Sequence, residues 1–186
     1  MRAVIVATQK ITEMKILGER YPSVMMPLID RPFIQHVVEY LVSQGVTDFD
    51  IVLSHLPEKV KALLGDGTRW GASIRYHLVK DPSRPYRPLK YAENQLGDTP
   101  VLLVHAERLP KIDVKATMPS SPGDGTILYC WHDNVEERNS RLSNWSGWGW
   151  LSKGCLIGLP ENADERDLFG HLCIPSDKVG QFGYLS

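Results

Sequence analysis

The sequence has little of what marks exported, membrane-spanning or nucleic-acid-binding chains. Three cysteines without a Cys-x-x-Cys pair argue against a disulfide framework and favour a reducing compartment. No stretch approaches the ~20 apolar residues of a membrane span, and the apolar run at residues 3–7 is too short for a secretory signal. The formal net charge of −1 gives no overall field that would attract nucleic acid or an anionic membrane. We therefore expect a cytoplasmic protein without nucleic-acid or membrane partners.

The spacing of cysteines and histidines allows one metal-binding arrangement. Cys130 and His132 are two positions apart, as are His171 and Cys173, so each pair would share one face of an extended segment. With Cys155 these side chains could form a zinc site, but structural zinc pairs usually have wider spacing. Burial of the cysteines as small apolar side chains is the simpler interpretation.

The first part of the chain alternates between two hydrophobic patterns. Apolar runs typical of buried parallel strands cover residues 3–7, 50–53 and 101–104, and residues 73–79 alternate as a further strand. Helical patterns cover residues 32–44, 57–64 and 90–96, and a polar loop is expected at residues 8–21. This alternation predicts βαβ units, and hence an α/β fold: a three-layer α/β/α sandwich with a mainly parallel, Rossmann-like sheet. The length suits one domain, residues 1–186.

The second part of the chain is less regular. We expect two strands, a helix and a loop there, at residues 126–131, 151–159, 164–172 and 118–125 respectively. Trp145, Trp148 and Trp150 lie close together in the sequence. Such clusters are more often core or interface anchors than ligand platforms.

Four motifs follow one another in the first part of the chain. PSVMMPLIDRP spans residues 22–32, HLPE residues 55–58, GDGTRWG residues 65–71 and VLLVHAE residues 101–107. They are similar to P-K-P-L-L-P-V-x-G-K-P, Y-L-P-E, G-D-G-S-R-F-G and V-L-V-L-N-G-D of the sugar-1-phosphate nucleotidyltransferases, also called NDP-sugar pyrophosphorylases. Several motifs in the right order are more specific than any one of them. Residues 1–115 thus resemble that family, and residues 116–186 would be a divergent or shortened part of the same domain.

The resemblance implies a particular reaction. A sugar 1-phosphate oxygen attacks the α-phosphorus of a nucleoside triphosphate, and pyrophosphate leaves. Such transfers depend on positioning and charge stabilisation. They need a glycine-rich loop whose N–H groups reach the phosphates, cationic side chains, and a carboxylate that holds a divalent cation.

The phosphate loop departs most from the family pattern. The family's G-x-G-T-R falls on QKITE, residues 9–13, so both glycines are gone and the β-branched Ile11 resists positive φ. Glu13 replaces the family's arginine and would repel phosphate, whereas Thr12 is retained. Ser23 replaces the lysine of P-K-P, and Arg31 keeps the charge of the later lysine.

The nucleobase segment of the family, L-G-T-A-G-A, is also altered. It falls on SRPYRP, residues 83–88, where prolines fix φ and delete hydrogen-bond donors. Arg84, Tyr86 and Arg87 could form another anion or aromatic site. We favour a rigid surface loop.

The resemblance still assigns candidate site residues of three kinds. The nucleotide-binding candidates are Ala7, Thr8, Gln9 and Lys10, the catalytic candidates are Thr12 and Arg31, and the metal candidate is Glu107. Glu107 stands where the family has the aspartate of N-G-D, and it would hold Mg²⁺ if the protein is active. His105 precedes it at a spacing that could extend this metal site, although we favour a pair at the strand end that simply faces solvent.

Three functions follow as alternatives. The family residues that are replaced here are those that take part in the chemistry, while the scaffold prolines, glycines and apolar strands remain. We therefore favour a catalytically impaired binding or regulatory homologue, a pseudoenzyme. Its ligand would be a nucleotide or nucleotide sugar, and a protein partner or a second copy could bind as well. The first alternative is an active sugar-phosphate nucleotidyltransferase with an atypical phosphate loop. The second is a structural subunit that uses a tryptophan-rich surface and takes no small ligand. Family members are longer, which leaves open that the chain is a shortened form.

Overall fold

The protein is built around a seven-stranded sheet. The computed structural model describes residues 1–10, 15–92, 99–108, 113–119, 127–131, 145–151, 159–172 and 182–185. The sheet strands are β1 (Arg2–Ala7), β4 (Asp48–Leu53), β5 (Ser73–Leu78), β6 (Val101–His105), β7 (Ile127–Trp131), β8 (Trp145–Leu151) and β9 (Phe182–Leu185), and a separate two-stranded hairpin pairs β2 (Pro27–Leu28) with β3 (Arg31–Pro32). The helices are α1 (Lys15–Arg20), α2 (Phe33–Ser43), α3 (Pro57–Leu64), α4 (Arg87–Ala92) and α6 (Glu165–Leu172), with 3₁₀ turns at Ser23–Met25 and Thr68–Trp70.

The strand order is β5-β4-β1-β6-β8-β7-β9. β1 pairs in parallel with β4 and β6, β4 pairs in parallel with β5, and β7 pairs in parallel with β9. Only β8 runs antiparallel to its neighbours, β6 and β7. The sheet is therefore mainly parallel, as the sequence predicts. From β1 the chain adds β4 and β5 on one side and β6 on the other, so the order reverses between β1 and β6.

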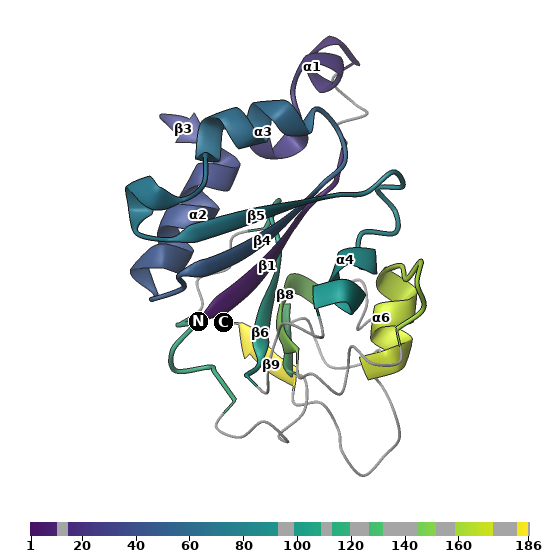
Figure 1. The fold of residues 1–186 in the computed structure, drawn as a ribbon. Helices are drawn as coiled ribbons and strands as arrows, with labels where there is room; N and C mark the ends of the chain where they lie inside the picture. The colour runs from purple at the N-terminus through teal and green to yellow at the C-terminus, as the bar shows by residue number, and fades with distance from the viewer. Residues whose placement is uncertain are drawn as a thin grey trace.

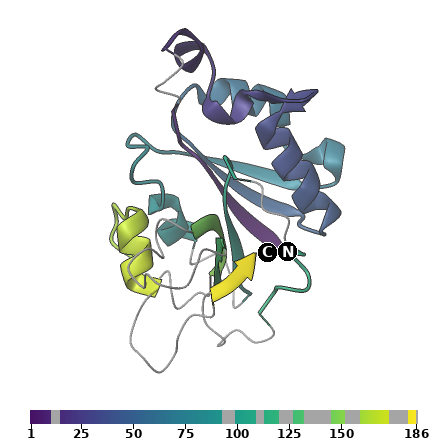
Figure 2. The ribbon, with the colours of Figure 1, turned by 180° about the vertical axis from the view of Figure 1, so that it is seen from behind.

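Helices lie on both sides of this sheet. In Figures 1 and 2, α2 and α3 cover one face, and α4 and α6 lie against the other. The two faces bury separate apolar clusters. One contains Ile5 of β1 with Ile34 and Leu41 of α2, and the other contains Val4 and Val6 with Leu89 and Leu168. β1 is thus buried from both sides, which explains its uninterrupted apolar sequence. The predicted three-layer α/β/α sandwich is confirmed.

The tryptophan segment is a buried strand. Trp145, Trp148 and Trp150 belong to β8 and are 0% exposed. The indole N–H of Trp145 donates to the Trp148 carbonyl at 3.0 Å, and that of Trp148 donates to the Arg108 carbonyl at 2.9 Å. These indoles are core, so the tryptophan-rich surface required by the structural-subunit alternative is not there. Glycine is required at position 147 of this strand, because its φ is +82° and a Cβ there would lie 2.9 Å from the His105 Cβ.

Other element predictions need correction in detail. The expected loop at residues 8–21 contains helix α1, and the helix expected at residues 90–96 begins earlier, at Arg87. Leu151, the first residue of the strand expected at residues 151–159, is the last residue of β8, and residues 152–158 lie outside the described part, so the prediction is not tested there. The predicted zinc arrangement also rests on side chains outside that part. Among the described helices, none combines the length and apolar character needed to cross a bilayer.

A buried carboxylate links three neighbouring strands. Asp50 of β4 is 2% exposed and accepts hydrogen bonds from Arg2 of β1 at 2.6 Å, and from Arg75 at 3.0 Å and His77 at 2.8 Å, both of β5. Burial alone would raise the pKa of Asp50, but these hydrogen bonds lower it overall. Because the lowered pKa means that the folded state favours the carboxylate, the network stabilises the fold at neutral pH.

We expect Asp50→Asn to lower the free energy of unfolding by about 3 kcal/mol at pH 7, the scale for breaking a buried ion pair. A carboxyl whose pKa is lower in the folded state stabilises the fold at pH values above its unfolded pKa of about 3.9. This stabilisation is lost as the pH falls further. The deficit should therefore shrink below about pH 4. Urea unfolding at several pH values measures it. Asp48→Asn on the same strand is the control, and an equal loss in both variants would contradict this account of Asp50.

Candidate active site at the strand switch point

The carboxyl ends of β1 and β6 lie side by side at the point where the strand order reverses. Open parallel sheets bind ligands in the crevice at such a point. The Ala106 N–H donates to the Val6 carbonyl at 2.9 Å, which continues the β1–β6 pairing beyond the last residue of β6. The segments that follow the two strands, Thr8 to Lys10 and Ala106 to Glu107, are therefore neighbours. The sequence candidates Ala7, Thr8, Gln9, Lys10 and Glu107 all lie at this edge.

Thr8 joins the ends of β1, β4 and β5. Its hydroxyl donates to the Pro82 carbonyl at 3.0 Å, and its own carbonyl accepts from the Ser54 hydroxyl at 2.9 Å. Thr8 is buried, so its side chain supports the loop after β5 and is not presented to solvent. Gln9 and Lys10, by contrast, are exposed.

Ser23 connects the two sides of the switch point. Its hydroxyl lies 2.8 Å from the Gln9 carbonyl and 3.2 Å from Glu107 Oε1, both acceptors for its proton. Ser23 is the first residue of the 3₁₀ turn that precedes the β2–β3 hairpin, so its hydrogen bonds hold that turn next to the loops after β1 and β6. The residue that stands in place of the family's lysine thus bridges two loops and carries no charge.

The carboxyl of Glu107 is largely withdrawn from water. Burial raises its pKa, and hydrogen bonds, including one from Ser23, offset part of the effect. Glu107 Oε2 is buried and has no hydrogen-bond partner among the described residues. An unpartnered buried carboxylate oxygen is costly, and it is an oxygen that a divalent cation could take.

The described residues fit a magnesium ion only as a single-carboxylate site. No group of three or more His, Cys, Asp or Glu side chains in the described ranges could hold a metal ion by itself. Mg²⁺ is often bound by one or two carboxylates together with substrate phosphates and waters. Glu107 meets that minimum among the described residues, and phosphates and waters would supply further ligands.

His105 does not join Glu107 in a metal site. Its Nε2 shares a hydrogen bond of 2.8 Å with the buried Tyr86 hydroxyl, and its ring packs edge-on against Trp145 at a centroid distance of 4.9 Å. Burial, with a smaller contribution from the Arg108 charge, lowers the pKa of His105 to about 3. The imidazole is therefore neutral at physiological pH and supplies no positive charge for phosphate.

The two catalytic candidates are not brought to this point by any described contact. Arg31 donates to Glu39 at 2.7 Å and to Asp30 at 3.0 Å on the hairpin and α2. Thr12 lies outside the described residues. The sequence names Ser23 only as a replacement of the family's lysine and Tyr86 only as part of a possible anion or aromatic site, and it gives no signal for their contacts with Glu107 and His105.

Comparison with known proteins agrees with this geometry. No family model matches the chain. A mannose-1-phosphate guanyltransferase of Gibberella zeae is 28% identical over 123 residues, which are 63% of this chain and 34% of that protein. A D-glycero-alpha-D-manno-heptose 1-phosphate guanylyltransferase of Campylobacter jejuni is 30% identical over 107 residues, 53% of this chain and 48% of that protein. The chain spans less than half the length of either relative.

Solved structures show the same fold over nearly the whole chain. A candidate glucose-1-phosphate thymidylyltransferase from Bacillus anthracis superposes with a TM-score of 0.78 at 14% identity, covering 100% of this chain and 87% of that one. HddC from Yersinia pseudotuberculosis, complexed with GMP-PN, gives a TM-score of 0.71 at 18% identity, covering 99% and 89%. The chain has the fold of the nucleotidyltransferases. Its sequence resembles the sugar-1-phosphate nucleotidyltransferases in particular, as the motifs predict.

We expect Glu107→Gln to raise the free energy of unfolding at pH 7 by about 1 kcal/mol, because a neutral amide has no charge to desolvate. A carboxyl whose pKa is raised by folding loses stability as the pH rises through the interval between its unfolded and folded values. The gain should therefore vanish below about pH 4, where both states are protonated. Urea unfolding against pH measures it.

Glu39→Gln is the matched control with the opposite expectation. The hydrogen bond from Gln35 and the charge of Arg31 lower the pKa of Glu39, so this substitution should give no gain at pH 7. A loss of stability in Glu107→Gln, or an equal change in both variants, would show that burial of the Glu107 charge is not the cause.

Proposed function

We propose that this protein is a binding homologue of the sugar-1-phosphate nucleotidyltransferases that takes a nucleotide or nucleotide sugar at the switch point and has lost most nucleotidyl transfer. The observation that carries the proposal is the Ser23 bridge. Its hydroxyl contacts both Gln9 and Glu107 at the place where the resemblance implies a lysine on phosphate. A hydroxyl can position the two loops, but it cannot offset the charge that develops during phosphoryl transfer.

The positive charges near the switch point support the same proposal. Arg31 is held by Glu39 and Asp30, and His105 is neutral because burial lowers its pKa to about 3. Of the sequence candidates described at this edge, Lys10 alone carries a positive charge, and it is exposed, whereas the neighbouring Arg108 donates to the Trp145 carbonyl. Exposed charges interact weakly with a ligand because water screens them. Binding through backbone groups and hydroxyls would remain, whereas catalysis of phosphoryl transfer would be slow.

A second candidate function rests on Glu107. Its buried, unpartnered Oε2 is what an active enzyme would use to hold Mg²⁺. A bound ion would supply charge stabilisation at the transferring phosphate, and Glu107 would be its ligand from this chain. This candidate differs from the first in requiring Mg²⁺ for triphosphate binding.

Isothermal titration calorimetry separates the two candidates. The panel consists of nucleoside triphosphates and their NDP-glucose and NDP-mannose counterparts, each with and without Mg²⁺. We expect saturable binding of at least one NDP-sugar that does not need Mg²⁺, and no pyrophosphate release when a triphosphate and a sugar 1-phosphate are supplied together. Pyrophosphate release would overturn the proposal in favour of an active enzyme. The absence of binding to any ligand of the panel would overturn both candidate functions.

A charge placed at position 23 tests the role of the bridge. We expect Ser23→Lys to strengthen triphosphate binding about tenfold, which is about 1.4 kcal/mol, the scale of one hydrogen bond to a charged group. Ser43→Lys is the control, because Ser43 is exposed at the end of α2 and bonds only its own helix through the Tyr40 carbonyl. Equal affinities in the two variants would mean that position 23 does not face the phosphates.

A further inference from the structure

The tip of the β2–β3 hairpin presents apolar side chains to solvent. Ile29 is 95% exposed, and Leu28 beside it is 40% exposed. Pro27, the first residue of β2, is exposed as well. In Figures 1 and 2 this hairpin projects from the body of the molecule next to α2 and α3. Single exposed apolar side chains are ordinary, but several of them together on a projecting tip are typical of an interaction site.

The backbone of Ile29 is strained. Leu28 pairs with Arg31, so the turn between them consists of Ile29 and Asp30. Of these two residues, only Ile29 has a positive φ, +62°. Hairpin turns with a positive φ at the first central position alone prefer glycine there, and a β-branched side chain is poorly suited to it. Isoleucine at this position therefore costs stability, and its side chain gains no burial within one copy of the chain.

Contacts with α2 hold the hairpin in this shape. The Phe33 N–H donates to the Met26 carbonyl at 3.0 Å, which closes the base of the hairpin. His36 Nε2 lies 2.9 Å from the Leu28 carbonyl, which accepts its proton. Strained residues persist only where the surrounding structure holds them, and they cluster at functional sites. The apolar tip is therefore a preformed feature of the fold.

A partner must meet this tip through side chains. Addition of a strand needs backbone N–H groups along the edge, but Pro27 and Pro32, which face each other at the base of the hairpin, have none. Proline on an edge strand prevents edge-to-edge pairing. The contact area that remains is the apolar surface of Leu28 and Ile29.

The charges at the tip are self-complementary. Asp30 and Arg31 form an ion pair at 3.0 Å, and 57% and 44% of their side chains are exposed. Exposed pairs contribute little, and a carboxylate and a guanidinium can each make further hydrogen bonds. In a two-fold contact the same two residues meet in both directions. Asp30 of each copy can therefore face Arg31 of the other, on either side of the two Ile29 side chains.

We propose that this tip is a self-association surface, at which a second copy of the chain packs its Leu28 and Ile29 against those of the first and pairs Asp30 with Arg31 in both directions. A partner of one charge sign would repel either Asp30 or Arg31, whereas an identical tip offers both an opposite charge. One hairpin from each copy makes a small interface, so the dimer is weak and depends on concentration. This surface goes beyond the function proposed for the switch point and does not require it.

Sedimentation velocity of the full chain over a wide range of concentrations tests the apolar contact. We expect a reversible monomer–dimer equilibrium. Ile29→Gly should weaken it about hundredfold, because each copy loses one buried side chain that contributes about tenfold. Glycine suits the positive φ, so the Tm of this variant at low concentration should not fall.

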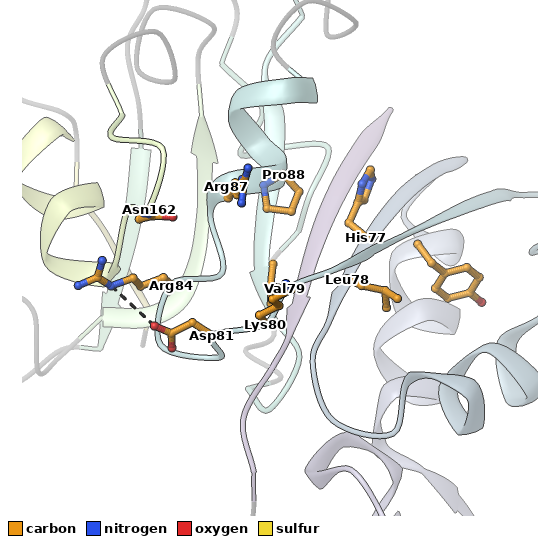
Figure 3. Close-up of a pocket in the computed structure, with 10 residues that line it drawn as sticks. His77, Leu78, Val79, Lys80, Asp81, Arg84, Arg87, Pro88 and Asn162 are labelled. Atoms are coloured by element: carbon orange, nitrogen blue, oxygen red, sulfur yellow. Dashed lines mark ion pairs between the residues drawn. The ribbon is translucent and has the colours of Figure 1, made fainter.

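Leu78→Gly is the matched control. Leu78 is 59% exposed, but it lies outside the hairpin, at the end of β5 beside a cavity (Figure 3). Its loss should leave the equilibrium unchanged. A wild-type chain that stays monomeric at every concentration would overturn the proposal, and so would an equal loss of association in Ile29→Gly and Leu78→Gly.

Charge reversal tests the pairing of Asp30 with Arg31. We expect neither Asp30→Lys nor Arg31→Glu to dimerise alone, because each would place like charges against each other at both contacts. An equimolar mixture of the two variants should dimerise, since both contacts then join opposite charges. Dimerisation of either variant alone, or a mixture that stays monomeric, would overturn the proposed two-fold arrangement.

Discussion

The position of β1 between β4 and β6 is the constraint on which the rest of the structure depends. β1 pairs in parallel on both sides, and its side chains are buried against helices above and below. From β1 the chain continues through β4 and β5 on one side, and β6 lies on the other side, so the strand order reverses between β1 and β6. The loops after β1 and β6 must then meet. The location of the candidate active site follows from the sheet and does not depend on which residues occupy those loops.

The side chains in and around the loops after β1 and β6 determine the chemistry that is available at the site. Ser23 holds the Gln9 and Glu107 segments together with a single hydroxyl, and Tyr86 and Trp145 enclose His105 so that its pKa falls and it stays neutral. Ser23 is uncharged and His105 is neutral, so neither offers a positive charge to a phosphate at this edge of the sheet. A conserved fold does not by itself imply a conserved reaction.

The sequence predicts the frame of this protein well because the frame depends on local patterns. The apolar runs of β1, β4 and β6 and the proline-led starts of α2 and α3 are visible in any short window of residues. The contacts that shape the site are different, because Ser23 meets Glu107 across 84 positions and Thr8 meets Pro82 across 74. Neither pair has a periodic signature. The sequence favours a core or interface role for Trp145, Trp148 and Trp150, but it does not identify β8 as a strand, since Gly147 and Gly149 interrupt the apolar pattern.

The measurement that tests the central claim most directly is an NMR titration of the Glu107 side-chain carboxyl in the wild-type protein and in Ser23→Ala. If Ser23 bridges the switch point as described, the pKa of Glu107 lies above its ordinary value of 4.5 in the wild type, because the group is buried. It should rise further in Ser23→Ala, because the hydrogen bond that lowers it is lost. An ordinary pKa in the wild type, or an unchanged pKa in the variant, would contradict a buried Ser23–Glu107 contact and with it the Ser23 bridge at the switch point.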